Sequence, residues 1–372
     1  MSEFQRLVIS CGGTGGHFFP GLSIARTFKQ QGGSVLLLLS GENSESQSEI
    51  AASFGIDAVT LPKLPNWKRH PLRFLAGTIK GMGKAYREMK HFAPQAILGM
   101  GAFTMTPVLT AGLRLRIPIA LHDGNARIGR SNRIFSFVAK FLGAGFPPVN
   151  SGACHCRIVD AGMPVRPELL EARNITRSEA VKKLNELYEC NLKEDVTTIL
   201  IFGGSLGAAV FNTVLPQALL KCSDQTFQVL HLCGKGKKAD AEAIYRDAGF
   251  PVLLLESSSR MEYFLGAADT VFCRAGGSTL AELALFGKGA VLIPYPYAAE
   301  GHQQDNAEYF ERNNAAVVVR NSDFTVDKAY ELLVSELFSD PAKKDERNSA
   351  AAKLMQPEAA QVMIREISAI IK

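Results

Sequence analysis

Cys11-Gly12-Gly13-Thr14-Gly15-Gly16-His17 is the stretch that decides the fold of this chain. It follows the apolar run Leu7-Val8-Ile9 and precedes Phe18-Phe19-Pro20-Gly21, which predicts a strand, a glycine-rich turn and a helix. Pro20 suits the first turn of that helix, and Gly32-Gly33 are expected to end it. Glycines let main-chain N–H groups approach a ligand closely, and a helix N-terminus favours an anion. We therefore expect a phosphate-binding turn here.

His17 stands at the mouth of this turn, and its side chain has two interpretations. An imidazole with an unperturbed pKa of about 6.5 is suited to removing a proton near neutral pH. The alternative is a histidine that caps the helix or faces solvent. Two common nucleotide-binding motifs do not fit, because Phe18 replaces the third glycine of the dinucleotide fingerprint and no Gly-Lys-Ser/Thr of a P-loop follows.

Length and composition indicate a soluble globular protein of two domains. The chain has 372 residues, 47% of them hydrophobic and 21% charged, which is too long for one ordinary core. Its seven cysteines lack metal-ligand spacing, with Cys154-His155-Cys156 the closest approach, so we expect reduced thiols of a cytosolic protein and no metal site. We identify no signal peptide and no membrane-spanning run. A net charge of +5 permits an anionic partner without identifying one.

Short apolar strands alternate with amphipathic helices, which is typical of parallel, doubly wound sheets. The strands predicted in the first half are 34–39, 56–61, 95–100, 117–121 and 141–146. A charged stretch precedes the second series, at 196–202, 227–232, 252–255, 270–273 and 290–293, and a second glycine-rich turn, Gly203-Gly204-Ser205-Leu206-Gly207-Ala208, follows its first strand. We predict two Rossmann-like domains facing a central cleft, 1–163 and 164–349, with a C-terminal helix within 350–372 joining the first.

Basic residues dominate the segment 63–90, interleaved with Trp67, Phe74 and Leu75. Such a face can bind an anionic membrane surface, where each Lys or Arg contributes about 1 kcal/mol. An ordinary solvated helix with a core stripe is the alternative. No nucleic-acid-binding signature accompanies the segment, so we expect no nucleic acid partner.

Arg274-Ala275-Gly276-Gly277-Ser278-Thr279-Leu280-Ala281-Glu282 follows another predicted strand and opens a helix. Its glycines free main-chain N–H groups, its hydroxyls add donors, and the helix terminus favours a diphosphate. Glu282 could accept hydrogen bonds from ribose hydroxyls, or it could be a surface charge. Gln303, Gln304 and Asn306 follow the loop 294–301 and offer donors and acceptors to a hydroxyl-rich ligand. Two glycine turns, a histidine and these amides are the layout of a nucleotide-sugar transferase.

With these residues assembled, essentially the whole chain resembles the MurG family of peptidoglycan glycosyltransferases. The motifs that carry the resemblance are 12–17, Gly99-Met100-Gly101, His122-Asp123-Gly124-Asn125, Gly162-Met163-Pro164-Val165-Arg166, Gly203-Gly204-Ser205, 274–282 and His302-Gln303. The resemblance implies a GT-B fold and an inverting, metal-independent reaction that needs no cofactor. N-acetylglucosamine would pass from its UDP donor to the 4-hydroxyl of the MurNAc residue of lipid I, giving lipid II at the cytoplasmic face of the cell (inner) membrane, with the enzyme bound peripherally. The absence of an Asp-x-Asp motif agrees with metal independence.

The resemblance also implies roles for individual residues. His17 would be the catalytic base, with Asp123 as a second catalytic group. The expected substrate contacts are Thr14, Gly15, Gly16, Asn125, Arg166, Ser205, Ser258, Gly277, Ser278, Thr279, Leu280, Ala281, Glu282, Gln303 and Asn306.

The chain departs from the family pattern at several positions. Asp123-Gly124 replaces Glu-Gln, Met163 replaces Asn, Leu206 replaces Gln, and 256–261 differs from the usual segment beside uracil. These departures keep three alternatives open. They are a transferase with another lipid or aglycone acceptor, a nucleotide-sugar epimerase of the same fold, and a binding module without catalysis.

Overall fold

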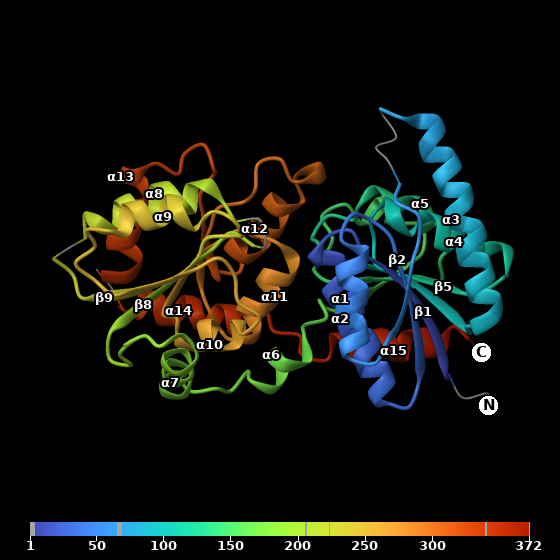
Figure 1. Cartoon of the computed structure of the whole chain (residues 1–372), viewed down its shortest axis with the longest axis horizontal. Helices are drawn as coiled ribbons and strands as arrows, with labels where there is room; N and C mark the ends of the chain where they lie inside the picture. Colours follow the sequence, from blue (N-terminus) through green and yellow to red (C-terminus); the bar gives the residue numbers. More distant parts are fainter. Residues whose placement is uncertain (1–3, 65–68, 205–206, 223, 339–340, 372) are drawn as a thin grey trace. The chain divides into compact units, whose positions relative to one another are not determined.

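The computed structural model describes residues 4–64, 69–204, 207–222, 224–338 and 341–371. Two compact units make up the chain: unit 1 is Met1–Arg166 with Gln356–Lys372, and unit 2 is Pro167–Met355. Each unit holds one parallel β-sheet with helices on both faces (Figure 1). The prediction of two Rossmann-like α/β domains is confirmed.

The sheet of unit 1 has the strand order β3-β2-β1-β4-β5-β6-β7 among the described residues, and every neighbouring pair is parallel. Its strands are β1 (Arg6–Cys11), β2 (Ser34–Leu39), β3 (Asp57–Thr60), β4 (Ala96–Gly99), β5 (Ile119–Asp123), β6 (Phe141–Ala144) and β7 (Arg157–Asp160). Its helices are α1 (Gly15–Gln30), α2 (Ser44–Ser53), α3 (Pro71–Phe92), η1 (Phe103–Met105), α4 (Thr106–Arg114), α5 (Arg130–Phe135), η2 (Ser151–Ala153) and α15 (Ala359–Ala369).

Alternating side chains of β1 enter two different cores of unit 1. Leu7 and Ile9 pack with side chains of α1, α2 and α15, while Val8 packs with those of α3 and α4. Both faces of a parallel sheet are therefore covered, as its near-continuous apolar strands require. The C-terminal helix α15 belongs to the first of these cores, where Met363 lies fully buried against β6.

The sheet of unit 2 has the order β10-β9-β8-β11-β12-β13 within the described ranges. Its strands are β8 (Thr197–Phe202), β9 (Phe227–Leu232), β10 (Val252–Leu255), β11 (Thr270–Cys273), β12 (Ala290–Leu292) and β13 (Ala316–Val318). Its helices are α6 (Pro167–Glu171), α7 (Arg177–Tyr188), α8 (Ala209–Leu220), α9 (Lys238–Tyr245), α10 (Met261–Ala267), α11 (Gly277–Leu285), η3 (Ala299–Gly301), α12 (His302–Arg312), α13 (Val326–Leu333), η4 (Val334–Phe338) and α14 (Pro341–Ala352). Helices α8, α9 and α13 cover one face, and α10 and α14 the other (Figure 1).

Two details differ from the expectations raised by the sequence. Helix α1 begins at Gly15, so Pro20 lies inside the helix and not in its first turn. Proline has no N–H to donate to the carbonyl four residues earlier. For Pro20 that carbonyl belongs to Gly16, in the glycine-rich first turn of the helix. The edge strands β7 and β13 were not predicted, and both are less buried than the central strands.

Candidate active site

The first glycine turn joins β1 to α1 at the carboxyl edge of the unit 1 sheet. Gly12 and Gly13 have φ angles of 128° and 83°, which glycine adopts without strain. A side chain on Gly12 would lie 2.8 Å from the carbonyl oxygen of Ser40, so main chain packs directly on main chain. Asn43 Nδ2 donates to Gly13 O at 2.9 Å. Contacts from residues 40 and 43 thus hold the turn, and the first N–H groups of a helix face its N-terminal end, where an anion can bind.

His17 lies in the first turn of α1 and is partly exposed. Its Nδ1 is 3.1 Å from Thr14 Oγ1. The opposite edge of the ring faces Gly101, where an added side chain would lie 3.4 Å from Nε2. When Nδ1–H donates to Thr14, Nε2 carries the lone pair, which gives the imidazole the orientation of a base. Gly101, at φ 94°, leaves the space for this ring.

Asp123 ends β5 and organises the loop that follows it. Its Oδ1 accepts hydrogen bonds from the main-chain N–H and side-chain amide of Asn125 at 3.2 and 3.4 Å, and its Oδ2 accepts from Gly129 N at 2.7 Å. The carboxylate is 5% exposed. This geometry makes Asp123 a positioning group that holds Asn125. Its direct part in catalysis stays a prediction.

Asn132 of α5 was missed by the sequence reasoning. Its Nδ2 donates to Asp123 Oδ2 and to His122 O, both at 2.9 Å, and the residue is 1% exposed. An added side chain on Gly101 would lie 3.5 Å from Nδ2, so the same glycine borders both Asn132 and His17. Its Oδ1 is buried with no hydrogen-bond partner among the described residues. No motif marks such an amide, because it acts through a main-chain carbonyl and a carboxylate nine residues away.

His122 and the segment 162–166 bring Arg166 towards α1. His122 is buried, with Nε2 3.0 Å from Gly162 O, and burial lowers the pKa of this imidazole. Ser23 of α1 donates its hydroxyl to Val165 O at 2.6 Å, and the Arg166 guanidinium lies 5.8 Å from the ring centroid of Phe19. Unit 1 therefore gathers one group of predicted site residues beside the start of α1 or at the end of β5, namely Thr14, Gly15, Gly16, His17, Asp123, Asn125 and Arg166.

The second glycine turn follows β8 in unit 2. Ser205 and Leu206 lie outside the described residues. Gly207 has φ 62°, and a side chain on it would lie 2.0 Å from Cys233 O, so only glycine fits.

Asn212 of α8 holds the same Cys233 carbonyl in position, because its Nδ2 donates to that oxygen at 3.0 Å. Its Oδ1 must then accept, so the His231 Nε2, 3.1 Å away, donates. Burial lowers the His231 pKa to about 3, so Nδ1 of this neutral ring accepts from the Tyr245 hydroxyl at 3.1 Å.

The segment 274–282 opens α11 with a group of hydrogen-bond donors. Ser278 Oγ is buried with no hydrogen-bond partner among the described residues, while Thr279 and Glu282 are partly exposed on the same helix. Leu280 is fully buried in the core, so any ligand contact of this residue is through its main chain. Gly277 and Ala281 complete the predicted set on this helix.

Arg274, which the sequence reasoning did not place among the contacts, braces the loop beside this helix. Its Nη1 donates to Ile293 O at 2.9 Å, Pro294 O at 3.2 Å and Asn321 Oδ1 at 2.8 Å. The guanidinium lies 5.6 Å from the centroid of Tyr295.

Three further predicted contacts have defined partners in unit 2. Gln303 Oε1 accepts from Tyr295 N at 2.9 Å, which orients the amide NH₂ as a donor. Asn306 is fully buried, and its Nδ2 donates to Ala275 O at 3.0 Å, so it anchors the main chain before the glycine pair. Ser258 Oγ is 2.8 Å from Tyr188 OH and accepts from Arg260 N at 2.9 Å.

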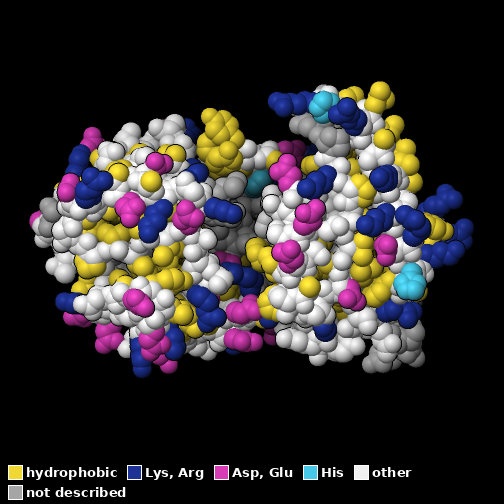
Figure 2. All heavy atoms as spheres, viewed as in Figure 1, with side chains coloured by type: hydrophobic (Ala, Val, Ile, Leu, Met, Phe, Trp, Pro, Cys, Tyr) yellow, Lys and Arg dark blue, Asp and Glu magenta, His cyan; other side chains and the backbone are white. Residues whose placement is uncertain are grey.

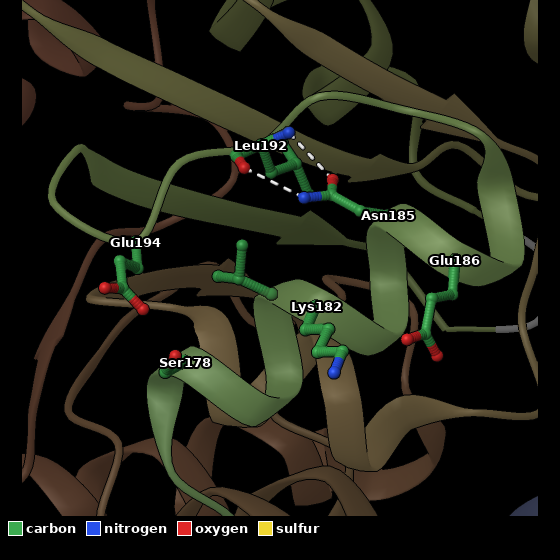
Figure 3. A pocket seen from close by; sticks show the side chains of 7 residues that line it. Ser178, Lys182, Asn185, Glu186, Leu192 and Glu194 are labelled. Atoms are coloured by element: carbon green, nitrogen blue, oxygen red, sulfur yellow. Dashed lines mark hydrogen bonds between the residues drawn. The ribbon is translucent and has the colours of Figure 1, made fainter.

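A shallow pocket of about 540 Å³ lies elsewhere in unit 2, against α7 (Figure 3). Asn185 bridges the main-chain N–H and carbonyl of Leu192 there, at 2.8 and 2.9 Å, and Lys182 and Glu186 line the rim. It contains none of the predicted site residues. Among the described residues, no three His, Cys, Asp or Glu side chains come together as a metal site would require.

Comparisons with known proteins agree over nearly the whole chain. Residues 7–142 match the glycosyltransferase family 28 N-terminal domain, and 198–363 match the family 28 C-terminal domain. A UDP-N-acetylglucosamine–N-acetylmuramyl-(pentapeptide) pyrophosphoryl-undecaprenol N-acetylglucosamine transferase of Desulforamulus reducens is 32% identical over 378 residues, covering 99% of each chain. The crystal structure of MurG from Acinetobacter baumannii has a TM-score of 0.77 and 27% identity, covering 98% of this chain and 99% of that one.

The fold alone is shared more widely. A UDP-GlcNAc 2-epimerase from Neisseria meningitidis, solved with UDP-GlcNAc bound, has a TM-score of 0.71 at 13% identity and covers 98% of this chain and all of its own.

Replacing Asn132 by Ala is expected to destabilise unit 1 by about 1 to 3 kcal/mol, because Asp123 Oδ2 and His122 O lose a buried donor. Urea unfolding monitored on unit 1 measures this. Arg130→Ala changes an exposed residue of the same helix and is the control. It should lower the free energy of unfolding by at most a few tenths of a kcal/mol. Equal effects of the two variants would contradict the anchoring role.

His231 makes the stability of unit 2 depend on pH. Its folded pKa of about 3 lies below the unfolded value of about 6.5, so the unfolded chain binds a proton first as the pH falls. The free energy of unfolding should drop by about 2 kcal/mol between pH 7 and pH 5 through this residue. Urea unfolding at both pH values should show this drop reduced in His231→Gln and unchanged in His91→Gln, an exposed control. A full drop in His231→Gln would refute the assignment.

Proposed function

The chain belongs to glycosyltransferase family 28, and we propose that it transfers N-acetylglucosamine from UDP-N-acetylglucosamine to the MurNAc 4-hydroxyl of lipid I, giving lipid II. The observation that carries the substrate assignment is the near-full-length relation to transferases named for this reaction. The enzyme is a UDP-N-acetylglucosamine-dependent glycosyltransferase, and its role is in peptidoglycan synthesis.

Unit 2 is proposed to bind the donor. The diphosphate would meet the N-terminus of α11, where main-chain N–H groups and the unpartnered Ser278 Oγ are available as donors. Glu282, on the same helix, would accept from the ribose hydroxyls. The Gln303 amide is oriented to donate to the sugar because Tyr295 N occupies its oxygen. Ser258 and Ser205 would contribute near uracil and the diphosphate respectively.

Unit 1, including α15, is proposed to bind the acceptor and to hold the base. His17 Nε2 would accept the proton of the 4-hydroxyl as its oxygen attacks the anomeric carbon from the face opposite UDP, which inverts the configuration. Thr14 fixes the ring through Nδ1. Asn125 is held in place by Asp123, and Arg166 adds a cation near α1. The charge that develops on the leaving diphosphate is stabilised by oriented N–H dipoles, so the proposed step needs no metal.

Helix α3 supports a peripheral association with an anionic membrane surface. Leu72, Leu75 and Ile79 are 81, 56 and 56% exposed, and their spacing puts them on one face of the helix. A neighbouring side of the helix, with Ala85 and Met89 in its later turns, packs into unit 1.

Basic side chains lie beside this exposed apolar stripe. At 100° per residue, Arg73, Lys80 and Arg87 form a row next to it, and all three are exposed. Figure 2 shows apolar side chains along this edge with Lys and Arg beside them. Trp67 lies outside the described residues. Within the described parts of the chain, no helix is both long and apolar enough to cross a bilayer. We propose that the enzyme acts at the cytoplasmic face of the cell membrane.

The transfer itself is tested with labelled UDP-N-acetylglucosamine and a lipid I analogue, in chelator and beside a reaction without acceptor. We expect acceptor-dependent product at an unchanged rate in chelator. His17→Ala should lower kcat by about 10²- to 10⁴-fold with donor affinity unchanged, because it removes the base. His91→Ala, an exposed histidine in the same unit, is the control.

Each other outcome of this assay has a definite meaning. Near wild-type turnover by His17→Ala would refute the base assignment. Donor binding without transfer to lipid I would refute the acceptor assignment, and epimerised UDP-sugar in the reaction without acceptor would show an epimerase.

Membrane association is tested by sedimentation with vesicles containing anionic lipid. A Leu72→Ser, Leu75→Ser, Ile79→Ser variant should bind at least about tenfold more weakly, because each buried apolar side chain contributes about 1.5 to 3 kcal/mol. A matched variant changes three exposed apolar residues of unit 2, Leu187, Tyr330 and Met355, to Ser and should bind like the wild type. Equal losses in both variants would contradict an α3 membrane face.

A further inference from the structure

Cys154 and Cys156 form a close thiol pair that the proposed reaction does not use. Their sulfur atoms are 3.7 Å apart, and Cys154 Sγ donates to Cys156 O at 3.6 Å. Both side chains are partly exposed, whereas Cys11, Cys222, Cys233 and Cys273 are buried. Cys190, also partly exposed, instead has Leu184 O and Asn185 Oδ1 as its sulfur contacts. The pair lies just before β7, in unit 1.

We propose that Cys154 and Cys156 are a redox-modification site, which closes to an intramolecular disulfide by exchange with a small-molecule disulfide such as oxidised glutathione. The Cys154 thiolate attacks one sulfur of the oxidant, forms a mixed disulfide and expels one thiolate. Cys156 then attacks the Cys154 sulfur and expels the second. Two thiols of the protein are oxidised, the oxidant is reduced to two thiols, and the two protons go to the departing thiolates.

The geometry assigns the order of the two steps. Partial burial, with the hydrogen bond that its S–H donates to Cys154 Sγ, raises the pKa of Cys156 to about 12, so this sulfur stays protonated at neutral pH. A protonated thiol attacks a free oxidant slowly, so Cys156 acts second. Once the mixed disulfide places an electrophilic sulfur beside it, Cys156 attacks that sulfur and its proton goes to the departing thiolate. The 3.7 Å contact places the two sulfurs within reach for that step.

Ring closure would move residue 155, which lies between the two cysteines. A disulfide needs its sulfurs about 2.05 Å apart, so closure must draw the two cysteines together from the present 3.7 Å and constrain the chain at 155. His155 N–H donates to Ser136 Oγ at 3.0 Å, and its ring stacks on Phe137 with centroids 3.7 Å apart. Phe137 is 69% exposed. Oxidation should therefore loosen the segment 136–138, at an exposed apolar surface of unit 1.

Peptide mapping of the full-length chain tests the site directly. Trypsin cleavage after Lys140 and Arg157 gives the peptide 141–157, which contains both cysteines and no other. After treatment with excess oxidised glutathione and then an alkylating reagent, we expect this peptide to lose both alkylatable thiols and two hydrogens. In Cys154→Ser and Cys156→Ser the ring cannot form, and the remaining cysteine should be alkylated or carry glutathione. Cys190, a partly exposed lone cysteine, serves as the internal control and should form no intramolecular bond.

Two results would overturn the proposal. One is a peptide 141–157 that stays fully alkylatable in excess oxidant, and the other is a peptide that carries two glutathiones without closing. Hydrogen exchange then measures the consequence. The amides of 136–138 should exchange faster in the oxidised wild type than in the reduced one, and equally under both conditions in Cys156→Ser. None of these measurements depends on the proposed transfer reaction.

Discussion

Direct packing of main chain on main chain at the carboxyl ends of the strands is the constraint on which the glycine turns of both units depend. Gly12 approaches Ser40 O, Gly41 approaches the Cα of Gly13, and Gly207 approaches Cys233 O, each closer than any side chain would permit. Because the turns are this tight, α1 begins at Gly15, with only three residues between it and the end of β1. The start of a helix, with its outward-pointing N–H groups, is thereby fixed at the sheet edge where ligands of this fold class bind.

Buried asparagines on three helices hold main-chain carbonyls near strand ends in place. Asn132 of α5, Asn212 of α8 and Asn306 of α12 are 1, 2 and 0% exposed. Each donates its Nδ2 to a main-chain carbonyl at or just after a strand end, respectively His122 O, Cys233 O and Ala275 O. An amide can satisfy a carbonyl without carrying a charge, whereas a buried lysine in the same place would face a large desolvation cost. A buried asparagine that donates to a main-chain carbonyl near a strand end is therefore found in both units.

The sequence indicated the fold class and most strands because buried parallel strands are short apolar runs bounded by turns. The predicted strands 34–39, 227–232, 252–255 and 270–273 match β2, β9, β10 and β11 residue for residue. Edge strand β7 has only two apolar residues, whereas β13 lies in the apolar run 315–319 and was missed although it fits the pattern. Among site residues, motif positions such as His17 and Glu282 could be proposed from spacing, since glycine turns mark them. The anchors Asn132 and Arg274 could not, because their partners are carbonyls and a carboxylate brought near only by folding.

A buried hydroxyl of α11 has no hydrogen-bond partner among the described residues, and this suits the proposed reaction, in which a diphosphate leaves. A buried hydroxyl such as Ser278 Oγ costs about 1 to 3 kcal/mol when it has no hydrogen-bond partner, and the rest of unit 2 must offset that cost. Asn306 holds Ala275 and Arg274 holds the loop at Ile293, so the segment around α11 cannot relax to satisfy the hydroxyl internally. The donor therefore remains oriented for a ligand. In the proposed reaction, charge that develops on the leaving diphosphate would meet dipoles already in place, and little reorganisation would be required at the moment of reaction.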